Sequence, residues 1–343
     1  MKIIILAALI GAAFLMGCTQ DVKKNGNDSF ADEVRLPMTP VKNQGRSNLC
    51  WAYAMLATIE TEHITRGDSV NLSAAYVGRM ALSEQVDGCF LNRGKKVPST
   101  RGVMPDLIRI IQTYGLMPYD SYRSAANFNT TARKLQTFVR HAAMTGRGID
   151  KARNEAKMVL DASVNPLPYH VYMYGMEYTP IEFAHSVCMP DEYQAFTSFT
   201  HMPMNKRAVL AVPDNRHGER FTNVGIDQLM ALMETSLRKG HPVCWEGDVS
   251  EEGFSFKNGV ADVAEADRKA SQEKRQREFE TFRTTDDHCM AIIGIAHDKQ
   301  GKKFFICKNS WGEGNRYGGL MYMSFDYARL KTVGIMVNNI IFS

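Results

Sequence analysis

Apolar residues recur at helical spacing through much of the chain. The segment 51–66 contains neither Gly nor Pro, and Met55, Leu56 and Ile59 fall on one face of a helix. The same spacing predicts further helices, which end at glycines or are interrupted by them, over residues 102–114, 134–160 and 226–239. The first of these helices begins directly beside a cysteine, Cys50.

Shorter apolar runs of the kind found in β-strands dominate the second half of the chain. They lie at residues 242–245, 289–295, 303–308, 320–323 and 333–337. The turn residues His297–Gly301 join the second and third of these runs into a hairpin. The change in character falls at Asn165–Pro168, where two prolines stand close together. We therefore predict the α+β class, with a helical lobe at about residues 43–164 and a β-rich lobe at about residues 165–343.

The N-terminal segment has the form of an export signal. A short basic start precedes an apolar run over residues 3–16, which is shorter than the roughly 18 residues that a membrane-spanning helix needs. We predict a signal peptide over residues 1–17. The next residue is Cys18, and the end of the run resembles the lipobox of bacterial lipoproteins, which implies lipid attachment to the Cys18 thiol. The alternative is a simple cleaved signal with an incidental cysteine.

Residues 18–33 are mostly polar and predict a flexible tether ahead of the folded domain. With the lipid attached, we expect an exported protein that is anchored to a bacterial membrane, the outer membrane by preference. The protein would face the periplasm or the cell surface. One of its partners would then be the lipid bilayer, contacted through Cys18.

Composition and charge exclude several classes of protein. The 343 residues are 44% hydrophobic and 23% charged, which suits a globular core and excludes a disordered chain. A net charge of +4 is too small for a nucleic-acid surface, so we expect no nucleic-acid partner. The seven cysteines form no Cys-x-x-Cys pair, and we expect neither a metal nor a cofactor. Five cysteines are predicted to be buried apolar residues, with any disulfide pairing left open: Cys89, Cys188, Cys244, Cys289 and Cys307.

Four residues suggest a nucleophilic site. Cys50 stands where a helix begins, and a helix N-terminus stabilises the thiolate, which is the reactive form. Gln44 lies on the preceding loop, where its amide could donate to an oxyanion together with the Cys50 backbone amide. His288 opens a predicted strand and Asn309 follows the partner strand. An amide that accepts a hydrogen bond from one imidazole nitrogen leaves the other to serve as general base and acid toward the thiol.

These residues stand in motifs that resemble the papain-like cysteine peptidases, and within them the bleomycin hydrolase and aminopeptidase C branch. The matching segments are Val41–Gln44 with Cys50–Trp51, Asp287–His288, Lys308–Gly312, and the stretches 178–183, 197–200 and 242–249. The similarity runs from about Val34 to about Val337. It implies a papain-like two-lobed fold over residues 34–343, with the cysteine helix in the helical lobe and His288 and Asn309 in the β-rich lobe.

The resemblance implies a role for each of the four residues. Cys50 would be the nucleophile and His288 the acid and base. Asn309 would orient His288, and Gln44 would donate to the oxyanion. The implied reaction is hydrolysis of a peptide bond through a thioester acyl-enzyme, on peptides or unfolded proteins.

Two further residues are implied to contact the site or the substrate. The Gly102 backbone would pair with the substrate chain, and Trp311 would shield the contact between the imidazole and Asn309. Arg101 stands where the branch has a first glycine, so the adjacent subsites should differ in shape. The oligomeric state stays open.

Three other functions stay open beside an aminopeptidase. In the branch, an arm at the C-terminus restricts cleavage to the substrate's N-terminus, and it would follow the strand at 333–337. Because only a few residues follow that strand, an endopeptidase of the same fold is an alternative. The others are a non-catalytic peptide-binding surface lipoprotein and a transglutaminase-like acyl transferase.

Overall fold

The computed structural model describes residues 29–173 and 175–342. The predicted signal peptide over residues 1–17 and the predicted lipid-attachment residue Cys18 lie outside this part of the chain. None of the helices within it combines the length and the apolar character that a bilayer crossing requires.

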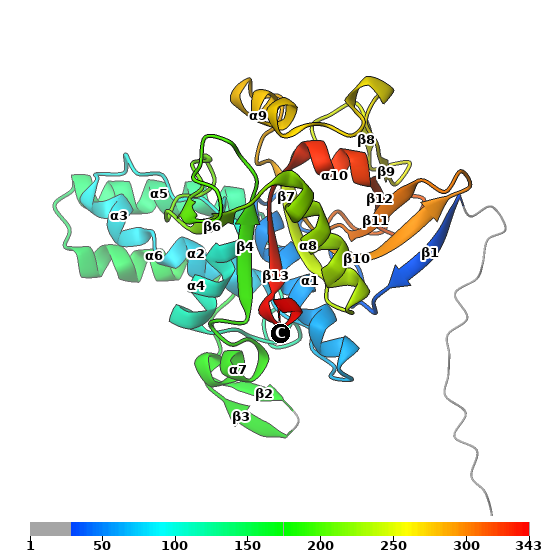
Figure 1. Cartoon of the computed structure of the whole chain (residues 1–343). Coiled ribbons are helices and arrows are strands. Elements are labelled where there is room, and N and C mark those ends of the chain that lie inside the picture. The colour runs from blue at the N-terminus through cyan, green and yellow to red at the C-terminus, as the bar shows by residue number, and fades with distance from the viewer. Residues whose placement is uncertain (1–28, 174, 343) are drawn as a thin grey trace, which may run out of the picture.

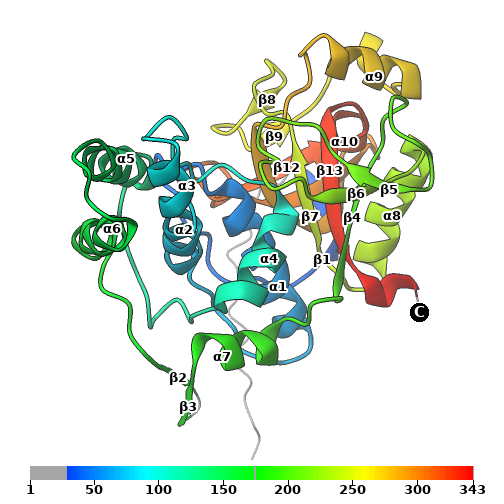
Figure 2. The same ribbon diagram turned by 90° about the vertical axis from the view of Figure 1, so that its left-hand side faces the viewer.

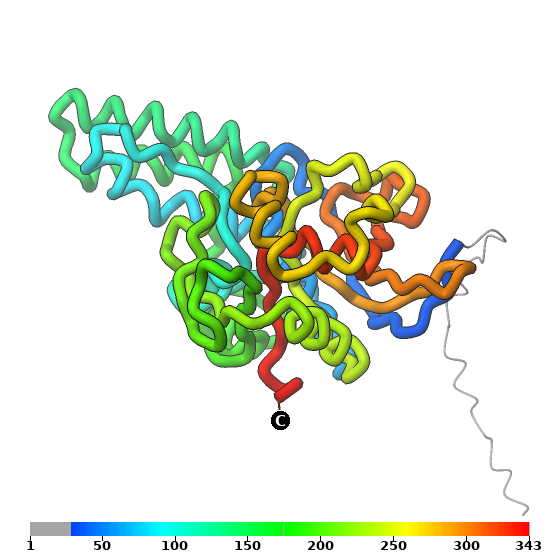
Figure 3. Tube along the Cα trace, turned by 45° about the horizontal axis from the view of Figure 1, so that its top comes forward, coloured from blue at the N-terminus to red at the C-terminus, as the bar shows by residue number. Residues whose placement is uncertain are grey.

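Helices form one side of the molecule. They are α1 (Cys50–Thr65), α2 (Ala74–Ser83), α3 (Val86–Leu91), α4 (Met104–Tyr114), α5 (Phe128–Met144), α6 (Ile149–Ser163) and α7 (Pro180–Val187). Figure 2 shows α2, α3, α5 and α6 on one side of α1, and the large sheet on the other. The pair α5 and α6 runs out from this side together with α3 (Figure 3).

The central helix α1 lies between the two sides and is buried around almost its whole circumference. Its buried residues run from Trp51 to His63 with Tyr53 as the one partly exposed position. A helix that packs on all sides needs apolar residues on all sides, which is why its sequence shows only a weak single-face pattern. One face contacts α2 and α4, and another contacts the strands β7 (Val243–Gly247) and β10 (His288–Asp298).

A large mixed sheet forms the other side. Its strand order is β5-β6-β4-β13-β7-β10-β11-β12-β9-β8. Its remaining strands are β4 (Tyr193–Thr197), β5 (Arg207–Val209), β6 (Arg220–Asn223), β8 (Phe254–Ser255), β9 (Val260–Ala261), β11 (Lys303–Lys308), β12 (Leu320–Ser324) and β13 (Thr332–Asn338). The helices α8 (Ile226–Arg238), α9 (Gln272–Glu280) and α10 (Phe325–Lys331) accompany it, as do the short turns Glu265–Asp267 and Asn339–Phe342. A separate hairpin is formed by β2 (Val171–Met173) and β3 (Met176–Tyr178).

Strand β1 (Phe30–Arg35) corrects the predicted extent of the tether. It pairs antiparallel with β10, from Phe30 opposite Asp298 to Arg35 opposite Gly294 (Figure 1). The ring of Phe30 stacks on Tyr322 with centroids 4.1 Å apart. Residues 30–33, which were expected to be flexible, are therefore part of the sheet, because a long strand with an open edge offers backbone partners to them. The rest of the predicted tether lies outside the described residues.

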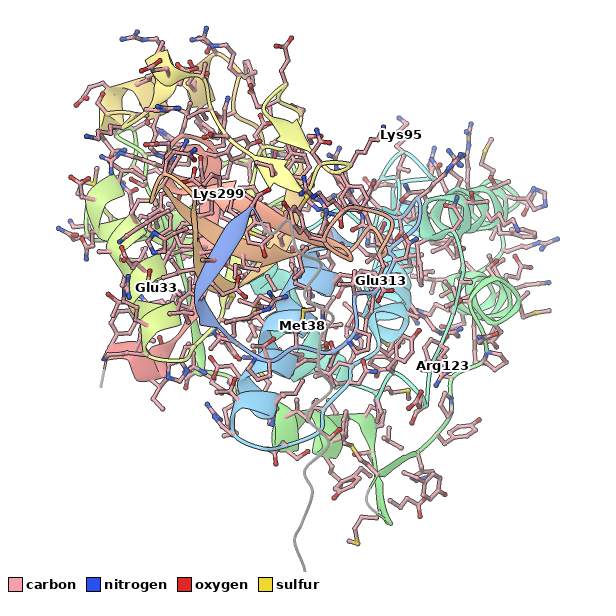
Figure 4. The ribbon with its side chains drawn as sticks, turned by 90° about the vertical axis from the view of Figure 1, so that its right-hand side faces the viewer. Glu33, Met38, Lys95, Arg123, Lys299 and Glu313 are labelled. Carbon is pink, nitrogen blue, oxygen red and sulfur yellow. The ribbon has the colours of Figure 1, made fainter. Side chains whose placement is uncertain are left out.

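The outer face of β1 is held to its neighbours by charge. Glu33 accepts a hydrogen bond from Arg238 on α8, and its Oε2 lies 2.6 Å from His297 Nε2 on β10. Figure 4 shows Glu33 on the side of β1 that faces α8. Lys299 lies in the turn that follows β10, near the Phe30 end of β1. The arginine and the histidine hold the pKa of the Glu33 carboxyl below its ordinary value.

A buried carboxylate, Glu60 on α1, joins the N-terminal segment to both sides of the molecule. It is 0% exposed. Its oxygens accept hydrogen bonds from Lys42 Nζ at 2.6 Å, Thr39 Oγ1 at 2.5 Å and the Leu72 backbone N–H at 2.7 Å. Lys308 on β11 lies 3.9 Å from the carboxylate and donates to Thr39 Oγ1 at 2.6 Å. Burial lowers the pKa of Lys308 to about 8.

We expect Glu60→Gln to lower the free energy of unfolding by about 3–5 kcal/mol, because it leaves the buried Lys308 and the partly buried Lys42 ammonium groups without their counter-charge. Urea unfolding followed by tryptophan fluorescence measures the loss. The matched control is Glu265→Gln, since Glu265 is exposed and should change stability by less than about 0.5 kcal/mol. A loss of less than about 1 kcal/mol for Glu60→Gln would contradict the role given to this cluster.

Candidate active site

Cys50 is the first residue of α1 and is half-buried. The residue before it, Leu49, makes no side-chain cap, so the first backbone N–H groups of the helix receive no cap from it. A helix end of this kind favours a negative charge on the thiol. The thiol sits where the helical side meets the start of β10, because α1 packs along that strand.

His288 and Asn309 meet across the hairpin that was predicted to carry them. His288 begins β10, and Asn309 follows directly after β11. His288 Nε2 lies 2.8 Å from Asn309 Oδ1, and both side chains are buried. The Ser310 backbone N–H also donates to Asn309 Oδ1, at 2.7 Å. With Nε2 held in this way, the other ring nitrogen, Nδ1, is left for Cys50.

The Cys50 thiol is set up to ionise. A hydrogen bond with Cys289 and the neighbouring His288 hold the pKa of Cys50 well below its usual range, against the burial that would raise it. Burial raises the pKa of Cys289 well above its ordinary value, so Cys289 stays protonated and donates to the Cys50 thiolate. A thiolate stabilised by a helix end and two neighbours is the nucleophilic form of cysteine.

Gln44 is hydrogen-bonded to Ser310, the residue that follows Asn309, and its side chain is fixed at both ends. Its Oε1 accepts from Ser310 Oγ at 2.6 Å, and its Nε2 donates to the Ser47 carbonyl at 2.8 Å. Its backbone N–H donates to the Ser310 carbonyl at 2.8 Å. The carboxamide nitrogen carries a second N–H, which is the donor that an oxyanion next to Cys50 would require.

Trp311 contacts the imidazole, and Gly102 lies against the helix that carries Cys50. The Trp311 ring packs on His288 with centroids 4.5 Å apart, which places it over the imidazole. Gly102 lies against Trp51, whose Nε1 donates to the Thr100 carbonyl at 2.8 Å. A Cβ at Gly102 would come within 3.0 Å of the Trp51 ring, so a side chain at this position would push on the helix that carries Cys50.

A loop of the β-rich side, residues 210–219 between β5 and β6, reaches the helical side next to Gly102. We call it the cross-lobe loop. Its polar contacts with the helical side include Asp214 Oδ1 with Arg101 Nε at 2.8 Å, Arg216 Nη2 with the Val97 carbonyl at 3.2 Å, and His217 Nδ1 with Asp106 Oδ1 at 2.7 Å. The two sides are thus tied together at the Gly102 end of the site.

The structure connects the four residues that sequence reasoning grouped. His288 contacts Asn309, Gln44 is hydrogen-bonded to Ser310 beside Asn309, and His288 helps to lower the pKa of Cys50. Their catalytic roles stay predictions. Sequence reasoning did not find the part played by Cys289, which was predicted only to be a buried apolar residue. Cys289 is indeed buried, and the five such cysteines are free in the described part of the chain. Its position directly after His288 on a strand was the signal that could have drawn attention to it.

The described residues contain no group of three His, Cys, Asp or Glu side chains arranged to hold a metal ion.

Comparison with known proteins gives one family profile and several relatives. The profile of the Peptidase C1-like family matches residues 169–341. Aminopeptidase G of Lactobacillus delbrueckii subsp. lactis is 23% identical over 367 residues, which cover 89% of this chain and 82% of that protein. Ananain of Ananas comosus is 41% identical over 291 residues, which cover 84% of this chain but only 53% of ananain.

The structure of PepW from Lactobacillus rhamnosis matches with a TM-score of 0.71 at 17% sequence identity, over 91% of this chain and 82% of PepW. The likeness in structure confirms the predicted α+β, papain-like two-lobed fold.

We expect Cys289→Ala to raise the pKa of the Cys50 thiol, because it removes a hydrogen bond to the thiolate. The rate of Cys50 alkylation by iodoacetamide, followed by mass spectrometry across pH, reports that pKa. The midpoint should move to higher pH in the variant, so alkylation at acidic pH slows. Cys307→Ala removes a buried thiol on β11 and serves as the control. Superimposable profiles for Cys289→Ala and the wild type would refute the contact.

Proposed function

The chain belongs to the Peptidase C1-like family and is a papain-like cysteine peptidase, and on that premise we propose that it is an aminopeptidase of the aminopeptidase C type. Cys50, His288, Asn309 and Gln44 carry out its reaction in this proposal. The observation that carries it is the 2.8 Å contact of His288 Nε2 with Asn309 Oδ1, which turns the other ring nitrogen toward a thiol with a lowered pKa.

In the acylation step, the Cys50 thiolate attacks the carbonyl carbon of the scissile peptide bond. The negative charge passes to the carbonyl oxygen, where the Gln44 amide and the Cys50 backbone N–H donate to it. The C–N bond then breaks, and protonated His288 gives its proton to the leaving amine. The products of this step are the amine and a thioester on Cys50.

In the deacylation step, water attacks the thioester carbonyl. His288, now neutral, accepts a proton from that water, and the C–S bond breaks. The acyl group leaves as a carboxylic acid, and the thiolate and imidazolium of the resting site are restored. Asn309 keeps the imidazole in one orientation through both steps, and Trp311 covers the ring.

Two observations support the restriction to N-terminal cleavage. Aminopeptidase G is similar over 89% of this chain. The cross-lobe loop also ties the two sides together at the Gly102 end, where we place the part of the substrate that becomes the acyl group. A substrate chain that extends far beyond that end would meet this loop.

An endopeptidase of the same fold is the second candidate, and a specific observation favours it. His288 pairs with Gly247 on β7, and Gly247 pairs with Thr332 at the start of β13. Strand β13 therefore begins beside the site and runs away from it, and the residues 339–342 that follow it pack near Glu192 and α8. These C-terminal residues do not enter the site, so they do not limit the length of the substrate.

Export, and lipid attachment through Cys18, belong to the proposal as well. They rest on the sequence of residues 1–18. Peptides or unfolded proteins outside the cytoplasm would then be the substrates.

The first test uses one peptide with a free and with an acetylated N-terminus, and locates the cleavages by mass spectrometry. Stepwise loss of residues from the free peptide only is expected of an aminopeptidase. Internal cuts in the acetylated peptide would identify an endopeptidase. Absence of any cleavage that Cys50→Ala abolishes would reject both and favour a peptide-binding protein.

The roles of individual residues are tested by kcat. We expect Cys50→Ala and His288→Ala to abolish turnover, and Gln44→Ala to lower kcat by about 10²–10³-fold through the loss of one oxyanion donor. Gln300→Ala, in the exposed β10–β11 turn, is the matched control and should leave kcat unchanged. A Gln44→Ala enzyme with full kcat would exclude Gln44 from the oxyanion site.

A further inference from the structure

Three carboxylates lie close to Cys50 on the side of Gly102, and the peptidase mechanism uses none of them. They are Asp214 on the cross-lobe loop, Asp286 just before β10, and Glu246 on β7. Their exposed fractions are 8%, 9% and 1%. The charge of Cys50 raises the pKa of each of them in addition to burial, so all three lie within electrostatic reach of the thiol.

The strand register shows where the Glu246 side chain points. Glu246 pairs with Cys289 on one side and with Gly334 on the other, and side chains of directly paired residues share a face of the sheet. Cys289 contacts Cys50, so this is the face that looks toward the start of α1. The face beside Gly334 is closely packed, since a Cβ there would lie 2.9 Å from the Phe221 ring and 3.4 Å from Met104, the first residue of α4. The carboxyl group of Glu246 therefore points to the packed side between the start of α1 and the start of α4.

Glu246 is a buried polar group without a partner. Its Oε2 has no hydrogen bond within the described residues. Burial, together with the nearby Asp286, raises the pKa of Glu246 well above its ordinary value, so the carboxyl group is neutral in the free protein. Leaving a buried carboxyl oxygen without a hydrogen bond costs about 1–3 kcal/mol of stability. Folded proteins tolerate such an unpaired group where it serves to bind a ligand.

The cluster already holds one cation of the chain itself. Arg101 Nε lies 2.8 Å from Asp214 Oδ1, and the Asp214 backbone N–H donates to Asp286 Oδ2 at 3.0 Å. The side chain of Arg101 is 50% exposed, so its guanidinium pairs with Asp214 at the open edge of the cluster. Arg101 marks the place where the cluster accepts a positive charge. Glu246 lies deeper and has no cationic partner among the described residues.

The open edge is accessible. A hollow of about 470 Å³ is bordered by Asn48 and Arg101 from the helical side and by Pro213 and Asp214 from the cross-lobe loop. Asn48 is close to Cys50 in the chain, so the hollow adjoins the site. This hollow reaches Asp214 directly, and Asp286 borders a second hollow of about 260 Å³ that shares Pro213 with it. Glu246, at 1% exposure, lies behind these two residues.

We propose that Glu246, Asp214 and Asp286 form a subsite for a cationic group of the substrate, on the acyl side of the scissile bond. The group is an ammonium or a guanidinium, supplied by the free N-terminus of the peptide or by a Lys or Arg side chain. The proposal rests on the proposed peptidase function. It explains why three acidic side chains and an unpaired buried oxygen are placed beside the nucleophile.

The test uses four peptides on the full-length protein. They share one sequence, except that the first residue, which lies on the acyl side of every scissile bond, is Lys or the uncharged norleucine. Each peptide is made with a free and an acetylated N-terminus. The ratio of kcat/KM for Lys over norleucine reports a side-chain cation, and the ratio for free over acetylated reports the terminal ammonium. We expect at least one of these ratios to be about tenfold or more in the wild type.

Variants then identify the residues responsible. Glu246→Gln keeps the shape of a carboxyl group that is neutral in the free protein, so it should fold, and it should bring the ratio close to 1. Arg101→Met removes the internal competitor and should increase the ratio. Glu265→Gln is the matched control on an exposed carboxylate and should leave the ratio unchanged. A ratio that is unchanged in both Glu246→Gln and Asp286→Asn would overturn the subsite.

Binding separates this proposal from the proposed function. Calorimetry with the same four peptides on Cys50→Ala, and on Cys50→Ala combined with Glu246→Gln, needs no turnover. Absence of hydrolysis together with a binding preference that Glu246→Gln removes would reject the peptidase function and keep the subsite. Hydrolysis with ratios near 1 in the wild type would keep the function and reject the subsite.

Discussion

A charge that must be paired inside the protein fixes the geometry of the site. Glu60 has no access to water, so its carboxylate needs Lys42, Thr39 and the Leu72 amide, and it draws Lys308 toward it. Lys42 lies two residues before Gln44 and Lys308 one residue before Asn309. The network therefore positions Gln44 and Asn309 relative to the helix that carries Cys50. Because an unpaired charge in the interior is costly, the residues of this network have little freedom to move relative to one another.

The sequence predicted the parts of the site that depend on local sequence patterns. Cys50 begins a helix free of Gly and Pro, and His288 and Asn309 flank a hairpin with clear turn residues, so periodicity alone located these elements. The resemblance to a known family then supplied the order of the three residues. The structure adds that the same residues meet in space, with the His288 to Asn309 contact already formed.

The parts that the sequence did not reveal depend on contacts between distant segments. Glu246 directly follows the predicted strand at 242–245, and only the register with Cys289 and Gly334 shows that its side chain lies on the face that looks toward Cys50. Asp214 lies in a loop without any repeating pattern, so nothing local connected it with Arg101. Strand β1 was missed for the same reason, because a short polar segment becomes a strand only when an edge is available.

The pairing of β1 with β10 has a mechanical consequence. Phe30 lies opposite Asp298, at the end of β10 that is remote from His288, and an 11-residue strand is roughly 35 Å long. A force that pulls on the N-terminal end of β1, in the direction from His288 toward Asp298, would act along the two strands. It would load the backbone hydrogen bonds between β1 and β10 in shear. Many bonds would then share the load at once, while the imidazole at the opposite end of the strand stays unstrained.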